Sequence, residues 1–430
     1  MVIARMFGIS DRRGEDDHSS RDGMLIAVSP FAFLPPTDAP TKRIYHLFRA
    51  LDGRGFRLVI VTRRSKRPSL DPDPGKHGFN NVLAVIETKD SRYCQLLNVE
   101  GVLKTLRSIG GGRVGGVFAS MLWAAPAAWL LSRLTGSAFI FDDHNFEYGR
   151  FSYASSPIRH AVRALEGFAC RNADLITVTT EEDRAELIRH YGVNDGNVEV
   201  VRNGTDVEPG GGRHSRELSR QGFGLRKDEV VFGFCGTFDY HPNVEAFQAM
   251  REVIAPSLRE EDVAFLVAGK GSKRLGREDG EHSPRIVLVG YVSRIEGFYA
   301  SCDCFLCPTV SGGGSRIKII EAASFGLPVI ATEKAMEGFP AELRHEGIMV
   351  AGDWEGIIGL ARRFSGDEEF RRRKTEAARR EAARVYEQCS WHRIGQGFSE
   401  MVYNRLRGEG SRSASPLTGA SPGSKGEVNR

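Results

Sequence analysis

The chain lacks the features that would place it in a membrane or on nucleic acid. Its longest apolar run, Val117 to Leu131, contains Pro126 and is shorter than the roughly 20 residues that a spanning helix needs. The net charge is only +4, and the sequence has no basic cluster with interleaved aromatics of the kind that contacts nucleic acid. We therefore expect no nucleic-acid partner, and we expect any membrane contact to be peripheral, at the inner membrane face.

Cysteine is also scarce, with seven residues at spacings that match no disulfide framework. The opening MVIARMFGIS leads into the polar run DRRGEDDHSSRDG rather than into an apolar signal segment. Both observations favour a reducing, cytoplasmic location. Cys302, Cys304 and Cys307 lie on one expected strand, whose side chains alternate between faces, and no fourth ligand follows at zinc-site spacing. We interpret these three as buried free thiols and predict no metal site.

The chain is long enough for two domains, because 430 residues exceed the about 250–300 at which a single core stops growing. We expect disorder in the polar segments 1–23 and 408–430, which are rich in Gly, Ser and Arg. Elsewhere, short apolar runs alternate with helical patterns, which predicts parallel α/β sheets. The pattern breaks in the Gly-rich segment 209–227 and then restarts. The sequence therefore predicts an N-terminal lobe over 24–208, a linker over 209–227 and a C-terminal lobe over 228–390.

The expected strands are β-branched or apolar runs bounded by turn residues. In the first lobe they begin at Met24, Phe56, Asn80, Gly115, Ser137, Ala173 and Asn197. In the second they begin at Val230, Val263, Arg285, Cys302, Pro328 and Gly347. The first helix is expected to begin at Ile44. Ligands bind at the carboxyl ends of parallel strands, so two such lobes facing each other predict a site in a central cleft.

One stretch, Ser311 to Thr332, combines the groups that an anion site needs. It reads as a Gly-rich loop, a helix that begins near Arg316 and ends at Gly326, and a strand. Three consecutive glycines permit close approach of the backbone to a ligand. Unpaired N–H groups at the start of the helix favour a bound anion.

Charged side chains on this expected helix support the same interpretation of an anion site. Arg316 and Lys318 add positive charge, and Glu321 suits bonds to sugar hydroxyls, as an acid binds the ribose in dinucleotide sites. We favour this over the alternative of a Gly-rich loop whose basic residues serve solubility. The predicted anion site therefore comprises Gly313, Gly314, Ser315, Arg316, Lys318 and Glu321.

This stretch resembles the donor-site motif of GT-B glycosyltransferases, in particular glycosyltransferase family 4. In that family a loop of small residues leads into K-x-x-E-A and then a Gly-x-Pro-Val run, matched here by Lys318-Ile-Ile-Glu321-Ala and by Gly326-Leu-Pro-Val. Further matches occur in order between Met24 and Arg407: FIFDDHNFEY, NVEVVRNGTD, GFCGTFDYHPNVEAF, FLVAGKG and WHRIGQGFSEMVYNRL. The last resembles a helix, over 391–407, that crosses back to the first lobe. The resemblance implies a GT-B fold, with two Rossmann-like doubly wound lobes facing a central cleft.

The resemblance also implies a reaction. A sugar would pass, with retention, from a nucleoside diphosphate sugar to an acceptor hydroxyl on a glycan, a lipid or a small molecule, without a metal or tightly bound cofactor. It implies that His144 contacts the donor sugar or phosphate and that the loop at Tyr291 and Val292 holds the nucleotide base. The residues alone leave a loop-capping histidine and ordinary strand-end packing equally open.

Three further residues follow strands of the second lobe. Gly236 and Thr237 would let the backbone approach the donor pyrophosphate, with a tight turn as the alternative. Lys270 would reach a phosphate, with a solvated lysine as the alternative. In the first lobe, we interpret Asp142 and Asp143 as helix-capping residues.

A basic run follows the second expected strand. Arg63, Arg64, Lys66 and Arg67 are interpreted as a solvated loop, with attraction of a phosphate-bearing acceptor or an anionic membrane surface as the alternative.

One position departs from the family pattern. Family 4 commonly carries two glutamates separated by seven residues; the second corresponds to Glu321, and the first would fall at Gly313. We interpret this as a subfamily difference in the donor-sugar contacts. Two alternatives stay open: a GT-B nucleotide-sugar epimerase and a catalytically silent protein that binds sugar nucleotides.

Overall fold

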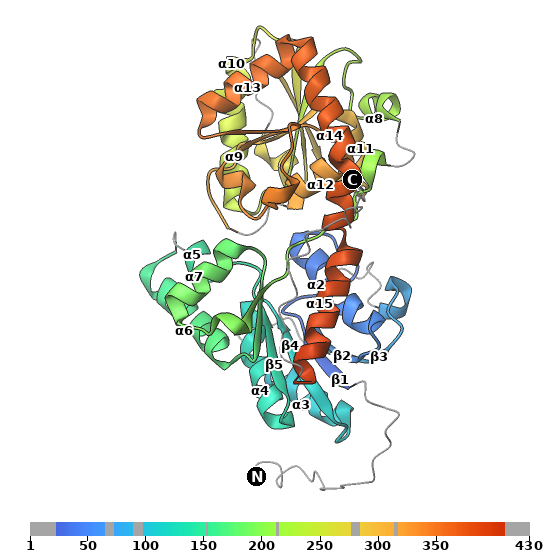
Figure 1. Cartoon of the computed structure of the whole chain (residues 1–430), viewed down its shortest axis with the longest axis vertical. Coiled ribbons are helices and arrows are strands. Elements are labelled where there is room, and N and C mark those ends of the chain that lie inside the picture. The colour runs from blue at the N-terminus through green and yellow to red at the C-terminus, as the bar shows by residue number, and fades with distance from the viewer. Residues whose placement is uncertain are drawn as a thin grey trace, which may run out of the picture.

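The computed structural model describes residues 23–64, 73–88, 98–151, 154–211, 215–276, 284–313 and 317–408. Within these ranges the chain forms two α/β lobes stacked along the long axis of the molecule (Figure 1). Disorder was expected over 1–23 and 408–430; of these segments only Gly23 and Gly408 are among the described residues, and the rest lies outside them. No helix among the described residues is long and apolar enough to cross a membrane.

Both lobes contain a parallel sheet with the same strand order. The N-lobe sheet runs β3-β2-β1-β4-β5-β6-β7 and the C-lobe sheet runs β10-β9-β8-β11-β12-β13, which is the doubly wound Rossmann order. The N-lobe strands are β1 (Met24–Val28), β2 (Arg57–Arg63), β3 (Val82–Thr88), β4 (Val114–Ser120), β5 (Ala138–Asp142), β6 (Leu175–Val178) and β7 (Val198–Val200). The C-lobe strands are β8 (Val230–Cys235), β9 (Val263–Ala268), β10 (Arg285–Gly290), β11 (Cys304–Cys307), β12 (Val329–Thr332) and β13 (Ile348–Ala351). The strand predictions and the predicted fold class are confirmed.

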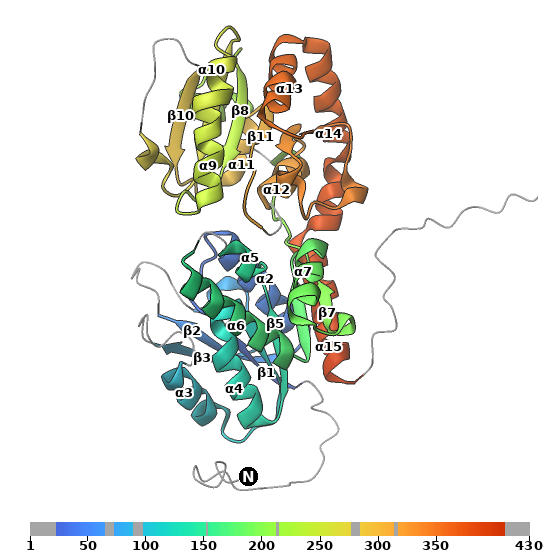
Figure 2. The same ribbon diagram turned by 90° about the vertical axis from the view of Figure 1, so that its left-hand side faces the viewer.

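Helices cover both faces of each sheet (Figure 2). Those of the N-lobe are α2 (Ala39–Gly53), α3 (Val99–Ile109), α4 (Ala125–Thr135), α5 (Glu147–Arg150), α6 (Ser156–Asn172) and α7 (Glu181–Tyr191). Those of the C-lobe are α8 (Arg216–Gly222), α9 (His241–Ala249), α10 (Ala255–Ser257), α11 (Ile295–Ser301), α12 (Ile317–Phe325), α13 (Trp354–Gly366) and α14 (Glu368–Cys389). The last helix is α15 (Trp391–Leu406).

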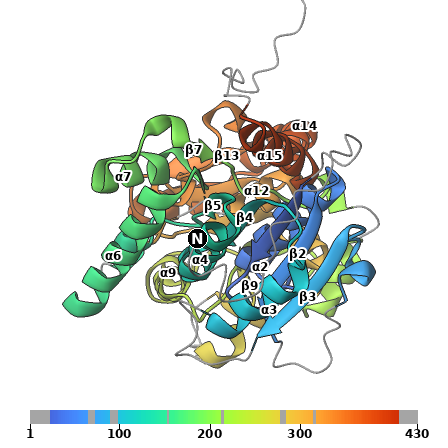
Figure 3. The ribbon, with the colours of Figure 1, turned by 90° about the horizontal axis from the view of Figure 1, so that it is seen from below.

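The two faces of the N-lobe sheet carry separate apolar cores. On one face, strand residues such as Val28 and Phe141 pack with α3, α4, α6 and α7. On the other, residues such as Ala27 and Phe118 pack with α2 and with Phe398 and Val402 of α15. Seen along the long axis, α6 and α7 lie to one side of this lobe and α3 and β3 to the other (Figure 3). The second core is therefore completed by the end of the chain.

The helix α15 crosses back to the first lobe, as predicted. It follows α14 after a break at Ser390, which pairs with Thr205 where the chain first passes between the lobes (Figure 1). A Cβ on Gly204 would lie 2.8 Å from the Trp391 ring, so this crossing point needs a residue without a side chain. The crossing is stabilised by the apolar face that α15 buries on the N-lobe.

Helix α2 begins earlier than the predicted Ile44. Asp38 accepts a hydrogen bond from the backbone N–H of Thr41, and the Thr41 hydroxyl closes a capping box with Asp38. The polar residues Thr41, Lys42 and Arg43 fall in the first turns of this helix. The apolar pattern missed these turns because their side chains are charged or polar.

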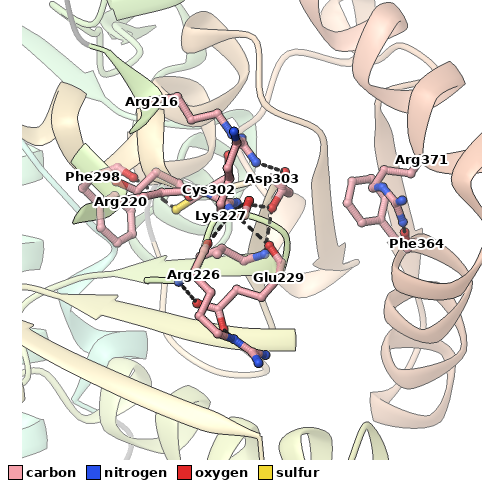
Figure 4. Close-up of polar contacts among 12 residues, drawn as sticks. Arg216, Arg220, Arg226, Lys227, Glu229, Phe298, Cys302, Asp303, Phe364 and Arg371 are labelled. Atoms are coloured by element: carbon pink, nitrogen blue, oxygen red, sulfur yellow. Dashed lines mark hydrogen bonds and ion pairs between the residues drawn. The ribbon is translucent and has the colours of Figure 1, made fainter. Parts of the chain in front are cut away.

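The segment 209–227, expected to be a linker, contains the helix α8. Arg220 on this helix is buried; its guanidinium donates to the Asp303 carboxylate at 2.5 Å and to backbone carbonyls of Ser301 and Glu229 (Figure 4). Arg216 also pairs with Asp303. The Gly-rich, charged composition of this segment predicted a linker. Composition could not reveal the contacts with Ser301 and Asp303, because they join residues about eighty positions apart in the chain.

Candidate active site

The carboxyl ends of the two sheets lie on facing sides of the lobes, with α9 and α12 on the C-lobe and α2 and α5 on the N-lobe (Figure 2). The lobes touch here: Lys42 Nζ on α2 lies 2.8 Å from Glu321 Oε1 on α12. In each lobe this edge includes the point where the strand order reverses, between β1 and β4 and between β8 and β11. Ligands of open parallel sheets bind at such points.

The backbone is closely packed at the end of β8. A Cβ on Gly236 would lie 2.7 Å from the Asn243 amide, and a Cβ on Gly269 would lie 1.9 Å from the Gly236 carbonyl oxygen. Gly269 also has a φ of +130°, which disfavours any other residue. The loops after β8 and β9 therefore pack backbone against backbone, and Thr237 is tied in through a 2.8 Å bond from Asn243 Nδ2 to its carbonyl.

Helix α12 carries the two charged residues of the predicted motif. Lys318 Nζ donates to Asn243 Oδ1 at 2.6 Å and lies 4.4 Å from the centroid of the Phe234 ring. Glu321 is nearly buried, and its Oε2 accepts a 3.0 Å bond from the Tyr299 hydroxyl. Spaced three residues apart, the two share a helix face and reach different partners. The structure thus brings Lys318 and Glu321 together with the loop at Gly236.

The loop after β11 is fixed to α9. The Ser311 hydroxyl donates to the Glu245 carboxylate, and Gly312 has a φ of +86° with its Cβ position 2.5 Å from the Tyr240 hydroxyl. At Gly313, by contrast, a Cβ would meet nothing within 4 Å. The position where the family carries its first glutamate therefore has room for a side chain. Three other predicted site residues, Gly314, Ser315 and Arg316, lie outside the described residues.

Three predicted donor-site residues lie on other loops of the C-lobe. Lys270 follows β9 with a side chain 59% exposed, and it pairs with Asp239 at 2.9 Å. Tyr291, after β10, is 58% exposed, whereas Val292 packs against the C-lobe core. Both follow β10, which is the edge strand of the C-lobe sheet.

His144 of the N-lobe lies in a buried network at the end of β5. Its Nε2 is 2.9 Å from Asp142 Oδ2 and 3.0 Å from the Ser120 hydroxyl. Asp142 also accepts bonds from the Arg43 guanidinium, the shortest at 2.6 Å, and from the Thr177 hydroxyl at 2.7 Å. The prediction that Asp142 caps a helix is wrong: α5 begins after Phe146 and has no side-chain cap, because the carboxylate is turned inward to Arg43.

This hydrogen-bond network determines the protonation state and the tautomer of His144. Burial alone would raise the pKa of Asp142, but Arg43 and His144 hold it well below its usual range, so Asp142 is an anion. Burial lowers the pKa of His144 more than the nearby charge of Asp142 raises it, so the ring is neutral near pH 7. An anionic Asp142 accepts the Nε2–H, which leaves Nδ1 as an acceptor. Among the described residues Nδ1 makes no hydrogen bond.

The neighbouring Asp143 belongs to a second buried group, with Glu147, Glu166 and Asp183. Neither Asp143 oxygen meets a donor N–H or hydroxyl in the described structure. Burial, and then the charge of Glu166, raise the pKa of Asp143, which is therefore protonated and donates to Glu166. Burial also raises the pKa of Glu166 to about 7, although Tyr191 and two backbone N–H groups donate to it.

The other two members of this group have partners of their own: Glu147 pairs with Arg150 at 2.7 Å, and Asp183 accepts a 2.8 Å bond from the Thr180 hydroxyl. Among the residues that the structure describes, no three His, Cys, Asp or Glu side chains are arranged to hold a metal ion. Cys302, Cys304 and Cys307 are buried, as predicted.

Several residues of the site were missed from the sequence. Lys42, Arg43 and Tyr299 carry no recognisable motif, and each reaches its partner across a long stretch of chain. Asn243 lies within the quoted GFCGTFDYHPNVEAF match, so its position was available although its bond to Lys318 was not.

Sequence comparisons identify the same two halves. The family described as Glycosyltransferase Family 4 matches residues 41–209, and the family described as Glycosyl transferases group 1 matches residues 229–364. A D-inositol 3-phosphate glycosyltransferase of Corynebacterium glutamicum (strain R) is 32% identical over 310 residues, which cover 66% of this chain and 71% of that protein. One of Rhodococcus opacus (strain B4) is 24% identical over 446 aligned residues, covering 94% and 96% of the two chains.

Solved structures share the fold. Sucrose-phosphate synthase from Thermosynechococcus elongatus superimposes with a TM-score of 0.69 at 17% identity, covering 90% of this chain and all of the other, 100%. Anabaena HepE, in complex with UDP and glucose, superimposes with a TM-score of 0.66 at 15% identity, covering 89% and 100%. At these identities the likeness concerns the arrangement of the two lobes.

Proposed function

The chain belongs to the group 1 glycosyltransferases, and on that premise we propose that it transfers a sugar from a nucleoside diphosphate sugar to an acceptor hydroxyl with retention of configuration. The observation that carries the donor site is the placement of Lys318 and Glu321 on one face of α12, with Lys318 bonded to Asn243, which in turn holds the glycine loop after β8. A carboxylate next to a cation and a glycine loop suits a molecule with a ribose diol at one end and phosphates beside it.

In the proposed reaction the bond between the anomeric carbon and the diphosphate oxygen breaks, and a bond to the acceptor oxygen forms on the same face of the sugar. The acceptor proton passes to the leaving phosphate, so no protein base is required. Lys318 faces the charge that grows on the leaving oxygens, with the backbone at Gly236, and Arg316, assigned from the sequence alone, is proposed to add positive charge to them. Such preorganised groups are each worth about 10²–10³ in rate.

His144 contributes through its tautomer. With Nε2–H donated to Asp142, the lone pair of Nδ1 is left to accept a hydrogen bond from a hydroxyl of the donor sugar. A neutral ring is a poor partner for a phosphate anion, so of the two contacts implied by the family resemblance we propose the sugar contact. Arg43 then acts through Asp142 as a positioning residue.

The remaining predicted residues are proposed to bind the nucleotide. Tyr291 and Val292 hold the base, and Lys270 lies at the outer rim, where its partner Asp239 is exposed to solvent. Gly313 is proposed to contact the phosphates, and the sequence motif alone assigns Gly314 and Ser315 to the same role. The donor is a co-substrate, and no tightly bound cofactor is proposed; any membrane contact is peripheral.

The acceptor is proposed to be a phosphorylated polyol. Several relatives bear the name D-inositol 3-phosphate glycosyltransferase. In this chain Arg63 ends β2 on the same edge of the sheet as Asp142 ends β5, which places a cationic residue at that edge of the acceptor lobe. A phosphate would be recognised there by its charge.

The test begins with thermal unfolding in the presence of UDP-, GDP-, ADP- and dTDP-sugars. A ligand at one hundred times its Kd stabilises by about 2.7 kcal/mol, so one nucleotide should stand out. That donor is then incubated with D-inositol 3-phosphate or with inositol, and release of the nucleotide is followed. Release with the phosphorylated acceptor supports the proposal. If a nucleotide sugar stabilises the protein but no acceptor hydroxyl causes release of the nucleotide, the protein is a catalytically silent binder. If none of the nucleotide sugars stabilises the protein, the proposed donor site is refuted.

A further inference from the structure

The one ion pair that reaches the predicted donor site from the other lobe joins Lys42 and Glu321, among the residues that the structure describes. Their side chains are 29% and 8% exposed, respectively, so the pair is largely shielded from solvent. A second pair between the lobes, Arg202 with Glu342, is longer, at 3.4 Å, and more exposed. The first pair therefore has the burial that makes a charge contact strong, and the second supplies a comparison.

Lys42 occupies a position that its own helix disfavours. It is the fourth residue of α2, and a cation in the first turn opposes the helix dipole. Its ammonium is also mostly withdrawn from water, which costs free energy. The Glu321 carboxylate raises the pKa of Lys42 above its usual value, against the effect of burial, so the side chain is charged. What holds this cation in place is thus a residue of the opposite lobe.

Glu321 has a partner on each oxygen: Lys42 lies on Oε1 and the Tyr299 hydroxyl on Oε2. A ribose that offers two hydroxyls to this carboxylate brings the donors to four, which fills its about four lone-pair directions, so the ammonium and the sugar crowd the same oxygen, Oε1. Lys42 has a flexible four-carbon stem and a point charge, so its ammonium can leave Glu321 without any movement of the backbone.

We propose that Lys42 is a donor-binding residue supplied by the acceptor lobe: Glu321 holds its ammonium at the interface, and the arriving ribose releases it onto the diphosphate. The donor would then be gripped from both lobes, by Lys318 from α12 and by Lys42 from α2. Closure of the lobes on the donor is coupled to the diphosphate charge, since Lys42 approaches it only from the N-lobe side. This inference rests on the proposed function, because it takes Glu321 as the ribose ligand.

The experiment compares two ligands, the nucleoside diphosphate and the corresponding uncharged nucleoside, by calorimetric titration. Lys42→Met keeps the length of the side chain and removes the charge. It is expected to weaken the diphosphate by tenfold or more and to change the nucleoside by less than twofold. Lys42→Arg is expected to recover part of the diphosphate affinity. Arg202→Met removes the other pair between the lobes and is expected to leave both affinities within twofold.

The outcomes separate the inference from its premise. Equal Kd values for Lys42→Met and wild type with the diphosphate overturn the inference and leave the proposed function standing. Equal losses for diphosphate and nucleoside also overturn it, because Lys42 would then serve only to orient Glu321. If the wild-type protein binds none of the nucleoside diphosphates, the proposed function and this inference fall together. Unfolding midpoints of all three variants within a few degrees of wild type establish that the comparison concerns folded protein.

Discussion

The two lobes share one strand order and present opposite chemistry at the same edge of the sheet. In the N-lobe, the strand ends carry buried charges: Arg43 with Asp142, and Asp143 with Glu166. In the C-lobe, the ends of β8 and β11 are apolar and neutral; burial raises the pKa of the Cys235 thiol to about 12. One topology therefore supports either a buried polar network that orients one side chain or an edge built of closely packed glycine loops.

The difference follows from what each lobe must bind. A diphosphate is recognised by many donors, so the C-lobe offers glycine loops and the cation Lys318. A sugar hydroxyl is recognised by one acceptor in one orientation, so the N-lobe fixes His144 through Asp142. The first device costs little stability, whereas the second places charges in the core, where each is stabilised only by its partner.

The largest loss of stability is expected from a substitution that breaks the buried charge network of the N-lobe. Arg43→Met leaves the fully buried Asp142 carboxylate without its cation, which typically costs about 3–5 kcal/mol. Denaturant unfolding followed by circular dichroism should show a lower midpoint, with a larger change than Arg64→Met. Arg64 pairs with Glu87 on the surface, where such pairs contribute about 0–1 kcal/mol. Equal midpoints for the two variants would contradict the claim that the N-lobe depends on buried charge.

The next effect concerns the C-lobe and appears in turnover instead of stability. Lys318→Ala and Glu321→Ala should each lower kcat/KM by about 10²–10³, because each removes a group aimed at the donor. The matched control is Lys334→Ala, whose lysine is exposed and pairs with Glu337. Wild-type turnover in either of the first two variants would remove that residue from the proposed site.

A smaller effect tests the second buried network through pH. The pKa of Asp143 is raised and that of Glu166 is raised to about 7, so the folded protein retains protons that an unfolded chain releases near about pH 4. Their contribution to stability is present at low pH and is lost as the pH rises towards 7. Asp143→Asn, which stays neutral and can still donate to Glu166, should therefore raise the unfolding midpoint at pH 8 more than at pH 5.

The control for this prediction lies in the other lobe. Asp239 is exposed, and hydrogen bonds from Lys270 and Arg274 lower its pKa, so Asp239→Asn should give no gain at pH 8. A midpoint for Asp143→Asn that shifts equally at both pH values would show that Asp143 is not the titrating group.

The smallest effect compares two adjacent glycines of the loop after β11. Gly312 has a φ of +86° and faces the Tyr240 hydroxyl, so Gly312→Ala should cost about 1 kcal/mol or more. Gly313→Ala meets open space and should stay within about 0.5 kcal/mol of wild type. Thermal unfolding of the two variants distinguishes them. A larger loss at Gly313 would show that the space at the position of the missing glutamate is not free for a side chain.

Much of the fold was predictable because its signals are local. Runs such as Val263–Ala268 are buried on both faces and bounded by turn residues, so each strand was recognisable without its neighbours. The helix α8 was not recognisable, because Arg220 reads as a charge in a Gly-rich segment and only its contact with Asp303 shows that it is buried. The helix α2 was predicted to begin late for the same reason, since Arg43 is a core residue only in the presence of Asp142.

The residues of the candidate site also divide into those that the local sequence predicts and those that only the tertiary structure reveals. By itself the sequence determined the two-lobed fold, the motif that places Lys318 and Glu321 three residues apart, and their common helix, because periodicity and turn chemistry act over a few residues. Only the tertiary structure decided that Lys42 meets Glu321, that Arg43 neutralises Asp142, and that His144 is neutral. Those contacts join residues from 99 to 279 positions apart, and charges at such separations have no sequence period to reveal them.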